Sequence, residues 1–421
     1  MIFNIRQVNN SEPIMEIARK IYICVTPFFP TPDSFRGAYI YDQVKAIQRT
    51  GKYDVIVFKP TSFNDKRENY DYEGIKVHLF PHIQMPSFFF NGLTNRLNCR
   101  MFLKCIGKLE LDINRIAVVH GHTSSFAAYG IALKNLNPRI QTLVQHHDRD
   151  PFTIRNGHLA KMKLNLYYRA QTNIKLFNQV DCHVSISRVV EDNLLSFPCP
   201  GKYESYPSYL DILKKVKKLP SISPKRSLVL YNGVDLTKFY PVEGMRNSSI
   251  FKIGCIGDFH HLKGQITLIK AVELLFRKGY GQLRVSFIGT GPLFDECRSY
   301  VTERGLAGYI RFEKEVHHHE LLAYYNSLDL FVLPTFYEGF GCVFTEAYAC
   351  GVPFMLCEHQ GASEYVADED KAKWLFPKEN YRRLSFLIEQ YMKYRYEQKV
   401  KYPYDVNVLV TEFLDQLDFK G

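Results

Sequence analysis

The chain has 421 residues, of which 46% are apolar and 23% are charged, a composition that suits two or three globular domains and excludes a disordered or fibrous protein. No apolar run approaches the roughly 20 residues that a membrane-spanning helix needs. The first twenty residues contain Glu12 and Glu16 and no continuous apolar core, which argues against a signal peptide. The ten cysteines form no CxxC pair, so we expect reduced thiols and a cytoplasmic protein.

The net charge of +11 is distributed unevenly along the chain. Residues 1–240 hold 33 Lys and Arg against 19 Asp and Glu, a formal +14, whereas residues 241–421 carry −3. Such an asymmetry indicates that the first half faces an anionic partner. A nucleic acid, an acidic membrane surface and a solvated basic surface without a partner are the alternatives at this point.

Strand-like apolar segments alternate with helical segments along the whole chain. In the first half we expect a helix over 42–53 and a surface excursion over 198–226, which is rich in Pro, Ser, Tyr and Lys. The alternation predicts an α/β fold with two doubly wound parallel sheets, whose ligands bind beyond the carboxyl ends of the strands. In chain order, the expected strands are 19–28, 53–58, 75–80, 116–122, 141–147, 181–187, 227–235, 251–257, 283–289, 309–314, 328–334 and 352–358.

A polar segment at 236–249, which carries Pro241 and Gly244, predicts the domain boundary. We therefore expect a first domain over 1–240 and a second domain over 241–400. Residues 401–421 are expected to form a helix that packs back on the first domain.

The most informative stretch is 334–351, which reads PTFYEGFGCVFTEAYACG. If a helix begins near Cys342, its unpaired N–H groups and its dipole favour a phosphate, and the preceding glycines let a ligand approach the backbone. Glu338 and Glu346 then suit the two ends of a nucleoside diphosphate sugar, with Glu346 at the ribose and Glu338 at the sugar. The alternative is a helix capped by Glu338 with a solvated Glu346, and the spacing alone does not decide between them.

Two further glycine turns follow predicted strands in the second half. Lys263 stands at the mouth of a helix after the strand 251–257, where it would neutralise a pyrophosphate or lie exposed as an ordinary surface lysine. The GTG turn at 289–291 is a weak signal, because such turns occur without any phosphate.

The order of these motifs resembles the retaining glycosyltransferases of the GT-B fold, family 4. The resemblance covers 228 to about 366 almost continuously, and covers the first half more loosely at 35–47, 118–122 and 184–194. The matching stretches are NGVDLTKFYP (232–241), the glycine and lysine spacing of 257–264, IGTGP (288–292) and DLFVLPTFYEGFGCVFTEAYACGVP (329–353).

This resemblance implies two Rossmann-like domains facing a central cleft, a nucleotide sugar as donor, and neither a cofactor nor a metal. It implies that Glu338, His122 and Lys263 are the catalytic residues, with His122 near the transferred sugar. Gly37 would lie against the phosphates, and Val316 would lie in the loop beside the base. The implied donor-binding residues are Gly37, Lys263, Glu338, Gly339, Phe340, Gly341, Cys342, Val343 and Glu346.

The chain departs from the family pattern in two places. Asp258 stands where the family commonly has an arginine of the diphosphate clamp, and Lys314 stands where a glycine is frequent. These departures leave the choice of nucleotide open. The run HHHE at 317–320 is not expected to bind a metal, because consecutive residues of a helix point in different directions.

A basic row in the first half bears on the acceptor. Arg96, Arg100, Lys104 and Lys108 recur every four residues. Such a row favours anionic lipid, at about 1 kcal/mol per basic residue near the surface. Beside them runs an apolar row, so that the segment 91–111 predicts an amphipathic helix: Leu93, Leu97, Met101, Cys105 and Leu109.

We therefore predict a metal-independent retaining glycosyltransferase that is peripheral on the inner face of the membrane and acts on a glycan or lipid-linked acceptor in cell-surface polysaccharide or glycolipid assembly. One alternative is a soluble enzyme that acts on a small sugar or sugar phosphate, with 91–111 as a helix that faces the core. A nucleic-acid-binding protein is the alternative from another class, but no interleaved aromatic and basic motif supports it.

Overall fold

The computed structural model describes residues 19–418 apart from 66, 86–87, 91, 153, 156–157, 160–162, 247–248, 315 and 317–319. At 154–155, 158–159 and 163–164 it describes the backbone alone. The segment judged not to be a signal peptide, up to residue 18, and most of the HHHE run therefore lie outside the described residues. Among the described residues, no helix combines the length and the apolar character needed to cross a bilayer.

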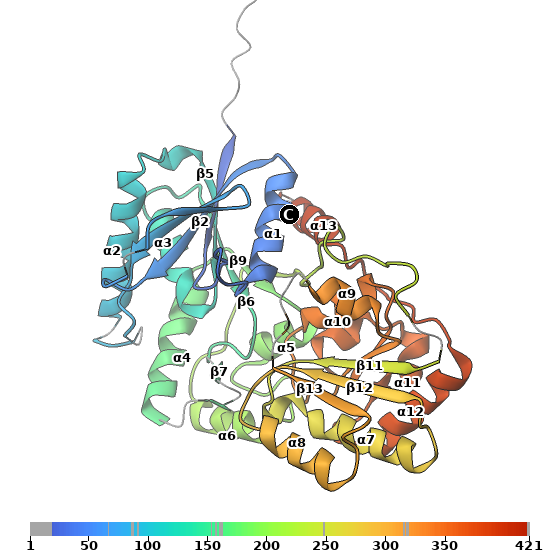
Figure 1. Cartoon of the computed structure of the whole chain (residues 1–421). Helices are drawn as coiled ribbons and strands as arrows, with labels where there is room; N and C mark the ends of the chain where they lie inside the picture. The colour runs from blue at the N-terminus through green and yellow to red at the C-terminus, as the bar shows by residue number, and fades with distance from the viewer. Residues whose placement is uncertain are drawn as a thin grey trace, which may run out of the picture.

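The N-terminal lobe, coloured blue to green in Figure 1, is built on an eight-stranded sheet in the order β10-β9-β6-β5-β1-β2-β4-β3. Neighbouring strands are parallel except β3 and β4. The central strands β1 and β5 are almost completely buried because helices cover both faces of the sheet. The elements are β1 (Lys20–Val25), α1 (Ala38–Arg49), β2 (Tyr53–Thr61), β3 (Tyr70–Tyr72), β4 (Ile75–Pro81), α2 (Leu93–Lys108), η1 (Ile113–Arg115), β5 (Ile116–His122), η2 (Ser124–Phe126), α3 (Ala127–Lys134), β6 (Gln141–His146), β7 (Ile154–Arg155), β8 (His158–Leu159), α4 (Lys163–Phe177), β9 (Cys182–Ser185), α5 (Arg188–Ser196), α6 (Pro207–Val216) and β10 (Ser227–Val229).

The C-terminal lobe is built on a six-stranded parallel sheet in the order β13-β12-β11-β14-β15-β16. The prediction of two doubly wound parallel sheets is therefore confirmed. The elements are β11 (Phe251–Ile256), η3 (His261–Lys263), α7 (Gln265–Arg277), β12 (Leu283–Ile288), α8 (Phe294–Glu303), β13 (Ile310–Glu313), α9 (Leu321–Asn326), β14 (Leu330–Leu333), α10 (Cys342–Ala349), β15 (Phe354–Cys357), η5 (Gly361–Tyr365), η6 (Asp368–Asp370), α11 (Lys371–Trp374), β16 (Leu375–Phe376), α12 (Tyr381–Tyr394) and α13 (Val406–Asp418).

The expectation that residues 198–226 form a surface excursion is wrong. Within 198–226, helix α6 buries Tyr209, Leu213 and Val216 in a core cluster that also contains Phe152. The stretch YLDILKKV places its apolar residues three and four apart, so one face of the helix is apolar despite the polar composition. The short strands β3, β7, β8 and β16 were not predicted either.

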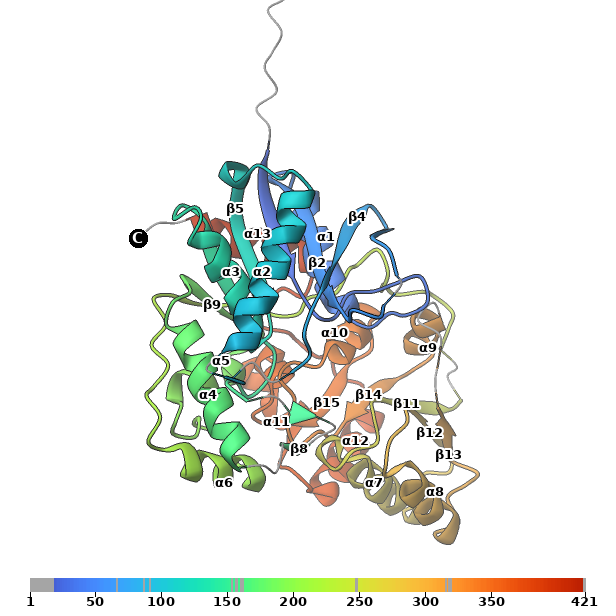
Figure 2. The same cartoon turned by 90° about the vertical axis from the view of Figure 1, so that its left-hand side faces the viewer.

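Helix α13, the last helix described, packs against α1, the first. Helix α13 lies beside α1 in both views of the molecule (Figures 1 and 2). Lys52 Nζ lies 2.8 Å from Asp415, and Arg49 donates to Asn407 at 3.2 Å. The segment before α13 also bridges to Val234, just before the second lobe.

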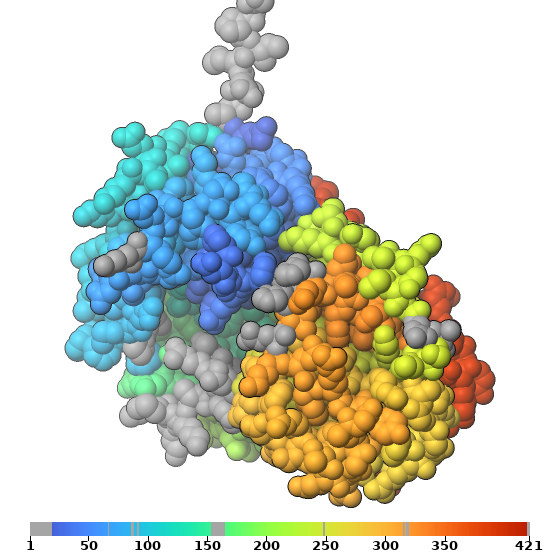
Figure 3. Space-filling view, viewed as in Figure 1, coloured from blue at the N-terminus to red at the C-terminus, as the bar shows by residue number. Residues whose placement is uncertain are grey.

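The two lobes are in direct contact, and in the space-filling view they meet along a diagonal boundary (Figure 3). Ser187 Oγ, at the start of α5, donates to the Gly339 carbonyl at 2.6 Å. The Glu364 carboxylate accepts the backbone N–H groups of Arg188 and Val189 at 3.0 and 2.8 Å. These bonds join the N-terminal lobe to the loop that follows β14 and to η5.

Candidate active site

Four loops converge on the boundary between the lobes, and each follows a strand at the point where strand order reverses. In the N-terminal sheet, β1 lies between β2 and β5, and in the C-terminal sheet β11 lies between β12 and β14. Gly37 lies in the loop after β1 and His122 ends β5, while the loops after β11 and β14 carry Lys263 and Glu338. Such reversal points form the crevices in which open parallel sheets commonly bind ligands, so these four residues lie at a position typical of a ligand site.

Glu338 and Lys263 form an ion pair across the loops of the C-terminal lobe. Their side chains are only 18% and 26% exposed. Burial alone would lower the pKa of Lys263, but the carboxylates of Glu338 and Asp258 more than offset this effect and raise it. Lys263 is therefore a charged group held inside the site, and the alternative of an ordinary surface lysine is wrong.

Glu338 does not cap α10. Helix α10 begins after Gly341 with no side-chain cap, and the Glu338 backbone N–H donates to Gln360 Oε1 at 2.7 Å. Glu346, one turn into the helix, is not a solvated carboxylate either. It accepts the Tyr325 hydroxyl at 2.7 Å, and burial raises its pKa to about 7.

The helices α1 and α10 begin in the same way and near one another. Gly37 and Gly341 precede them in the left-handed region, with φ of 93° and 85°, and neither helix has a side-chain cap or an acidic residue in its first turn. Asp42 of α1 is close enough to raise the pKa of both Cys342 and Glu346. Two uncapped helix starts therefore direct their positive ends toward the boundary that Lys263 also faces.

His122 is buried at the end of β5, and its side chain does not bond to the backbone. Its Nδ1 lies 3.2 Å from His147 Nε2, and its own Nε2 has no recorded partner. Burial lowers the pKa of His122 well below its ordinary value and that of His147 to about 4. Both rings are therefore neutral near pH 7.

Three residues just after β6 belong to the site and were missed by the sequence analysis. The His147 carbonyl lies against Gly339, where an added Cβ would come within 2.6 Å of it. Burial raises the pKa of Asp148 to about 6, one of its oxygens has no recorded partner, and Glu338 is near enough to contribute to the shift. The guanidinium of Arg149 lies 3.3 Å from the centre of the Tyr337 ring.

The other predicted donor-binding residues have distinct surroundings. Phe340 is buried and packs on Tyr365 with ring centres 5.4 Å apart, so that only its backbone faces the site. Cys342 and Val343 form the first turn of α10 and are half-buried. Val316 is half-buried, and the residues around it lie outside those described, so its contact with a base stays a prediction.

Asp258 is exposed after β11 and adds negative charge beside Lys263. In the described chain, no group of three or more His, Cys, Asp or Glu side chains is arranged to hold a metal ion. Metal independence itself stays a prediction.

The basic row of α2 is exposed as expected, but the apolar row was assigned to the wrong positions. Leu93 is 42% exposed, whereas the residues that face the core are Thr94, Asn98, Phe102 and Ile106. The true buried row lies one position further along the helix. One face of α2 is therefore core-facing, as the soluble alternative expects. The opposite face carries the basic row: Arg96, Arg100, Lys104 and Lys108.

Comparison with known families decides the classification. Residues 243–403 match the family model of glycosyl transferases group 1, and residues 37–207 match that of glycosyltransferase family 4. Together, the two matches support a group 1 glycosyltransferase. The two matches leave out residues 1–36, 208–242 and 404–421, and therefore β1, most of α6, β10 and α13.

Individual relatives of this group 1 glycosyltransferase are distant. An uncharacterised glycosyltransferase of Methanocaldococcus jannaschii is 25% identical over 72% of this chain and 71% of its own length. The GDP-mannose-dependent alpha-(1-6)-phosphatidylinositol monomannoside mannosyltransferase of Mycolicibacterium smegmatis is 29% identical, over 32% of this chain and 39% of its own length. The match therefore spans well under half of the second enzyme.

Solved structures confirm the predicted GT-B fold. The Anabaena protein HepE in complex with UDP-glucose superposes with a TM-score of 0.60 over 94% of this chain and 99% of that one, at 16% identity. The catalytic domain of starch synthase IV from Arabidopsis thaliana, bound to ADP and acarbose, gives a TM-score of 0.66 over 94% and 98% of the two chains, at 12% identity. At these identities the likeness establishes the fold alone.

Proposed function

We propose that this group 1 glycosyltransferase transfers a sugar, with retention at the anomeric carbon, from a nucleoside diphosphate sugar to a hydroxyl of a glycan or lipid-linked saccharide. The observation that carries the proposal is that two uncapped helix starts, at Gly37 and Gly341, lie near the ion pair of Lys263 with Glu338. Two helix dipoles and one ammonium form a site for a diphosphate. HepE, which shares the fold, holds UDP-glucose.

Each end of the donor has a carboxylate in this arrangement. Glu346 accepts two adjacent ribose hydroxyls in place of the bond from Tyr325, and hydrogen bonds from two hydroxyls favour its ionised form. Glu338 holds the hydroxyls of the sugar. Its ion pair with Lys263 opens when the diphosphate arrives, because the ammonium then turns to the phosphates.

The chemical step needs stabilisation of the leaving nucleoside diphosphate more than it needs a strong base. Lys263 and the N–H groups of α10 hold the charge that develops on the leaving oxygen. The leaving phosphate takes the proton of the acceptor hydroxyl as the new bond forms on the same face of the sugar. The neutral His122, with an unpartnered Nε2, supports the transferred sugar by a hydrogen bond.

A thermal-shift series tests the donor site. UDP, GDP and ADP are added to the full chain, since a ligand that binds only the folded state raises the melting temperature with its concentration. We expect one of the three to raise it, and we expect Glu346→Ala to abolish the shift. Glu303→Ala, at the exposed end of α8, is the matched control and retains it. An undiminished shift in Glu346→Ala contradicts the ribose role.

The acceptor side is proposed to rest on an anionic membrane surface from the cytoplasm, so that the acceptor is lipid-linked. The structure adds an apolar tip to the basic row of α2: Met85, Phe89, Phe90 and Leu93 are 48%, 38%, 72% and 42% exposed just before or at the start of the helix. Aromatic rings beside lysines and arginines suit the boundary between lipid headgroups and acyl chains. The mycobacterial relative is named for a phosphatidylinositol acceptor.

Co-sedimentation with vesicles tests this surface. We expect binding to vesicles that contain phosphatidylserine and none to pure phosphatidylcholine vesicles. Arg100→Glu/Lys104→Glu and Phe90→Ser should each weaken it, whereas Lys217→Glu/Lys218→Glu, an exposed pair elsewhere on the lobe, should not. Equal binding to both lipids, or equal loss in the control pair, favours the soluble alternative that acts on a small sugar or sugar phosphate.

A further inference from the structure

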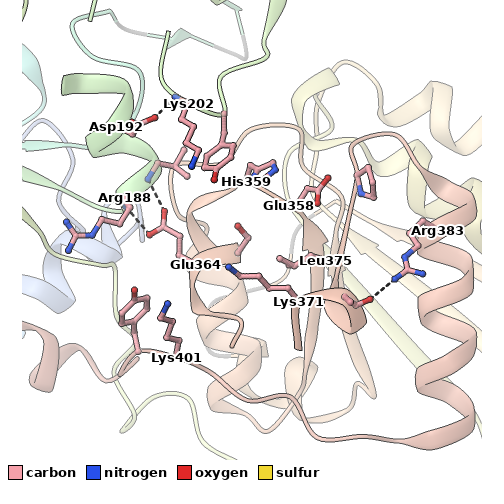
Figure 4. Close-up of a pocket in the computed structure, with 16 residues that line it drawn as sticks. Arg188, Asp192, Lys202, Glu358, His359, Glu364, Lys371, Leu375, Arg383 and Lys401 are labelled. Carbon is pink, nitrogen blue, oxygen red and sulfur yellow. Dashed lines mark hydrogen bonds between the residues drawn. The ribbon is translucent and has the colours of Figure 1, made fainter. Parts of the chain in front are cut away.

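A second site lies behind the donor loop. A cavity of about 600 Å³ opens between the lobes, and none of the residues assigned to the donor lines it (Figure 4). The N-terminal lobe contributes the start of α5 and the segment around Lys202, while the C-terminal lobe contributes parts of 358–364, 371–377 and 401–402. Glu358 and His359 line the cavity, and the next residue, Gln360, accepts the backbone N–H of Glu338.

Three lysines enter the cavity from different segments. Figure 4 shows Lys202 above the cavity and Lys371 and Lys401 below it. Lys371 and Lys401 share one exposed partner, Asp368, at 2.6 and 2.9 Å. Since Asp368 is 62% exposed, an anion inside the cavity can replace it at little cost.

The acidic residues of the cavity are largely engaged elsewhere. Glu364 accepts two backbone N–H groups of α5 and the Tyr231 hydroxyl, and Asp192 accepts the backbone N–H of Lys202 at 2.5 Å. Glu358 is the remaining carboxylate, and in Figure 4 it lies on the far side from Lys401. Because three lysines and two arginines line the cavity against three carboxylates, its lining has an excess of positive charge.

The two arginines of the lining are also engaged. Arg188 pairs with Glu191 at 2.8 Å, and its guanidinium extends away from the cavity in Figure 4. Arg383 donates to the Ala372 carbonyl at 2.6 Å. The lysines, and not the arginines, are thus the groups that would meet a ligand.

The remaining wall is apolar and aromatic. Val189, Leu375 and Pro377 line it. The rings of Tyr203 and His359 stack with centres 3.9 Å apart and planes 7° apart, and they join the two lobes at the rim. A ligand that fits this wall carries a flat ring or another apolar body in addition to its negative charge.

We propose that this cavity binds a small phosphorylated molecule with a ring body, distinct from the nucleotide sugar. The phosphate lies among Lys202, Lys371 and Lys401, where ammonium groups form charge-assisted hydrogen bonds to its oxygens. The ring lies on the apolar wall beside Tyr203. The volume is in the range of sites for small ligands, which is roughly 300 to 1,000 Å³.

Calorimetric titration of the full chain with phenyl phosphate tests the proposal. We expect one site per chain, no binding of uncharged phenol, and an affinity about tenfold weaker in Lys371→Ala/Lys401→Ala, since two charge-assisted bonds are lost. Lys214→Ala/Lys215→Ala removes the same charge from exposed positions on α6 and should bind as the parent does. Unaltered melting temperatures show that both double variants are folded.

Lys263→Ala separates this cavity from the donor site. Binding of phenyl phosphate that is retained in Lys263→Ala and lost in Lys371→Ala/Lys401→Ala supports the proposal. The reverse pattern places the phosphate at the donor site and overturns it. The proposal is equally wrong if phenyl phosphate does not bind, or if the Lys214→Ala/Lys215→Ala control weakens binding as much.

Discussion

The two sheets carry different kinds of groups at the strand ends that face the other lobe. The N-terminal sheet ends in side chains that bond to one another: His146 bonds to Asp150 at 2.6 Å and to His183 at 2.9 Å, and His122 lies against His147. The C-terminal sheet ends in glycine turns, uncapped helix amides and the single ion pair of Lys263.

This difference separates a rigid edge from an adaptable one. Buried side chains that satisfy one another hold a fixed geometry, and losing one partner leaves another unpaired. Backbone amides and one ion pair leave room for a ligand to replace the contacts. The four changes below test whether the N-terminal edge responds mainly in stability and the C-terminal edge mainly in ligand binding.

The largest effect is expected at Arg149, which forms a buried ion pair with Glu204 at 2.6 Å. Arg149→Met leaves the Glu204 carboxylate buried without its partner, which costs about 3–5 kcal/mol. Urea unfolding measures the loss. Lys214→Met breaks an exposed pair with Asp211 and serves as the control, with an expected change below about 1 kcal/mol. Similar losses of unfolding free energy in the two variants would show that the buried Arg149–Glu204 pair stabilises the fold no more than an exposed pair does.

The next effect is expected at Gly341. An alanine there has φ near 85°, and its Cβ would lie 2.9 Å from both Glu338 Cγ and the Phe344 ring. Gly341→Ala should cost about 1–3 kcal/mol in stability and displace Glu338 from the donor. Gly305→Ala is the control, because φ there is 68° and an added Cβ would meet no atom within 4 Å. This variant therefore has the backbone strain without a side-chain clash. Nucleotide binding should therefore fall in the first variant only, and an equal fall in both would contradict the contact with Glu338.

Asp148 should produce a smaller, pH-dependent effect. Its pKa in the folded state, raised to about 6 by burial, exceeds the ordinary value of 3.8, so the folded state keeps a proton that the unfolded state has lost. This contribution to stability is present at low pH and is lost as the pH rises from about 4 to 6, by at most about 1.4 kcal/mol per pH unit. Asp148→Asn should flatten that part of the stability profile.

Asp368 is the control for this titration, because its partners Lys371 and Lys401 lower its pKa to about 2. Its contribution is lost only as the pH falls below about 4, so Asp368→Asn should leave the profile between pH 4.5 and 6.5 unchanged. Urea unfolding across that range measures both variants. A profile of Asp148→Asn that matches the parent would mean that Asp148 titrates normally.

The smallest effect is expected at Asp258, which is exposed beside Lys263. Asp258→Arg replaces a negative charge by a positive one near the proposed diphosphate, and should strengthen nucleotide binding by about threefold. Glu303→Arg makes the same charge change far from the cleft. Weaker nucleotide binding in Asp258→Arg would place the diphosphate away from Lys263.

The sequence predicted the C-terminal edge better than the N-terminal one, for a physical reason. Glycine turns after apolar strands and the pair Glu338 and Glu346 are local patterns, so their positions could be read along the chain. The network of His147, Asp148 and Arg149 depends on Glu204 and Tyr337, which are distant in sequence. Only the polar run HHDRD at the end of a predicted strand signalled it.

Helices α2 and α6 show the same difference between features that the sequence predicts and features that depend on tertiary contacts. The amphipathic character of α2 was predicted, but its buried row was not, because Thr94 and Asn98 are polar residues that face inward. Asn98 bonds to the backbone of Ile83, a contact that composition cannot reveal. Helix α6 was not predicted because its lysines make the segment polar on average, although one narrow face of the helix is apolar. Strand positions depend on local hydrophobicity and were therefore predictable, whereas the inward direction of polar side chains depends on tertiary neighbours.

The bond between Glu338 and Lys263 has a consequence for selectivity among the many phosphates that surround an enzyme. Without donor, the ammonium already has an internal anion, so a free phosphate ion must displace a carboxylate and leave it without a counterion. In the proposed donor site, a nucleotide sugar would bring hydroxyl groups for Glu338 together with phosphates for Lys263, and would so compensate both members of the separated pair. We therefore expect the site to bind inorganic phosphate more weakly than a nucleotide sugar.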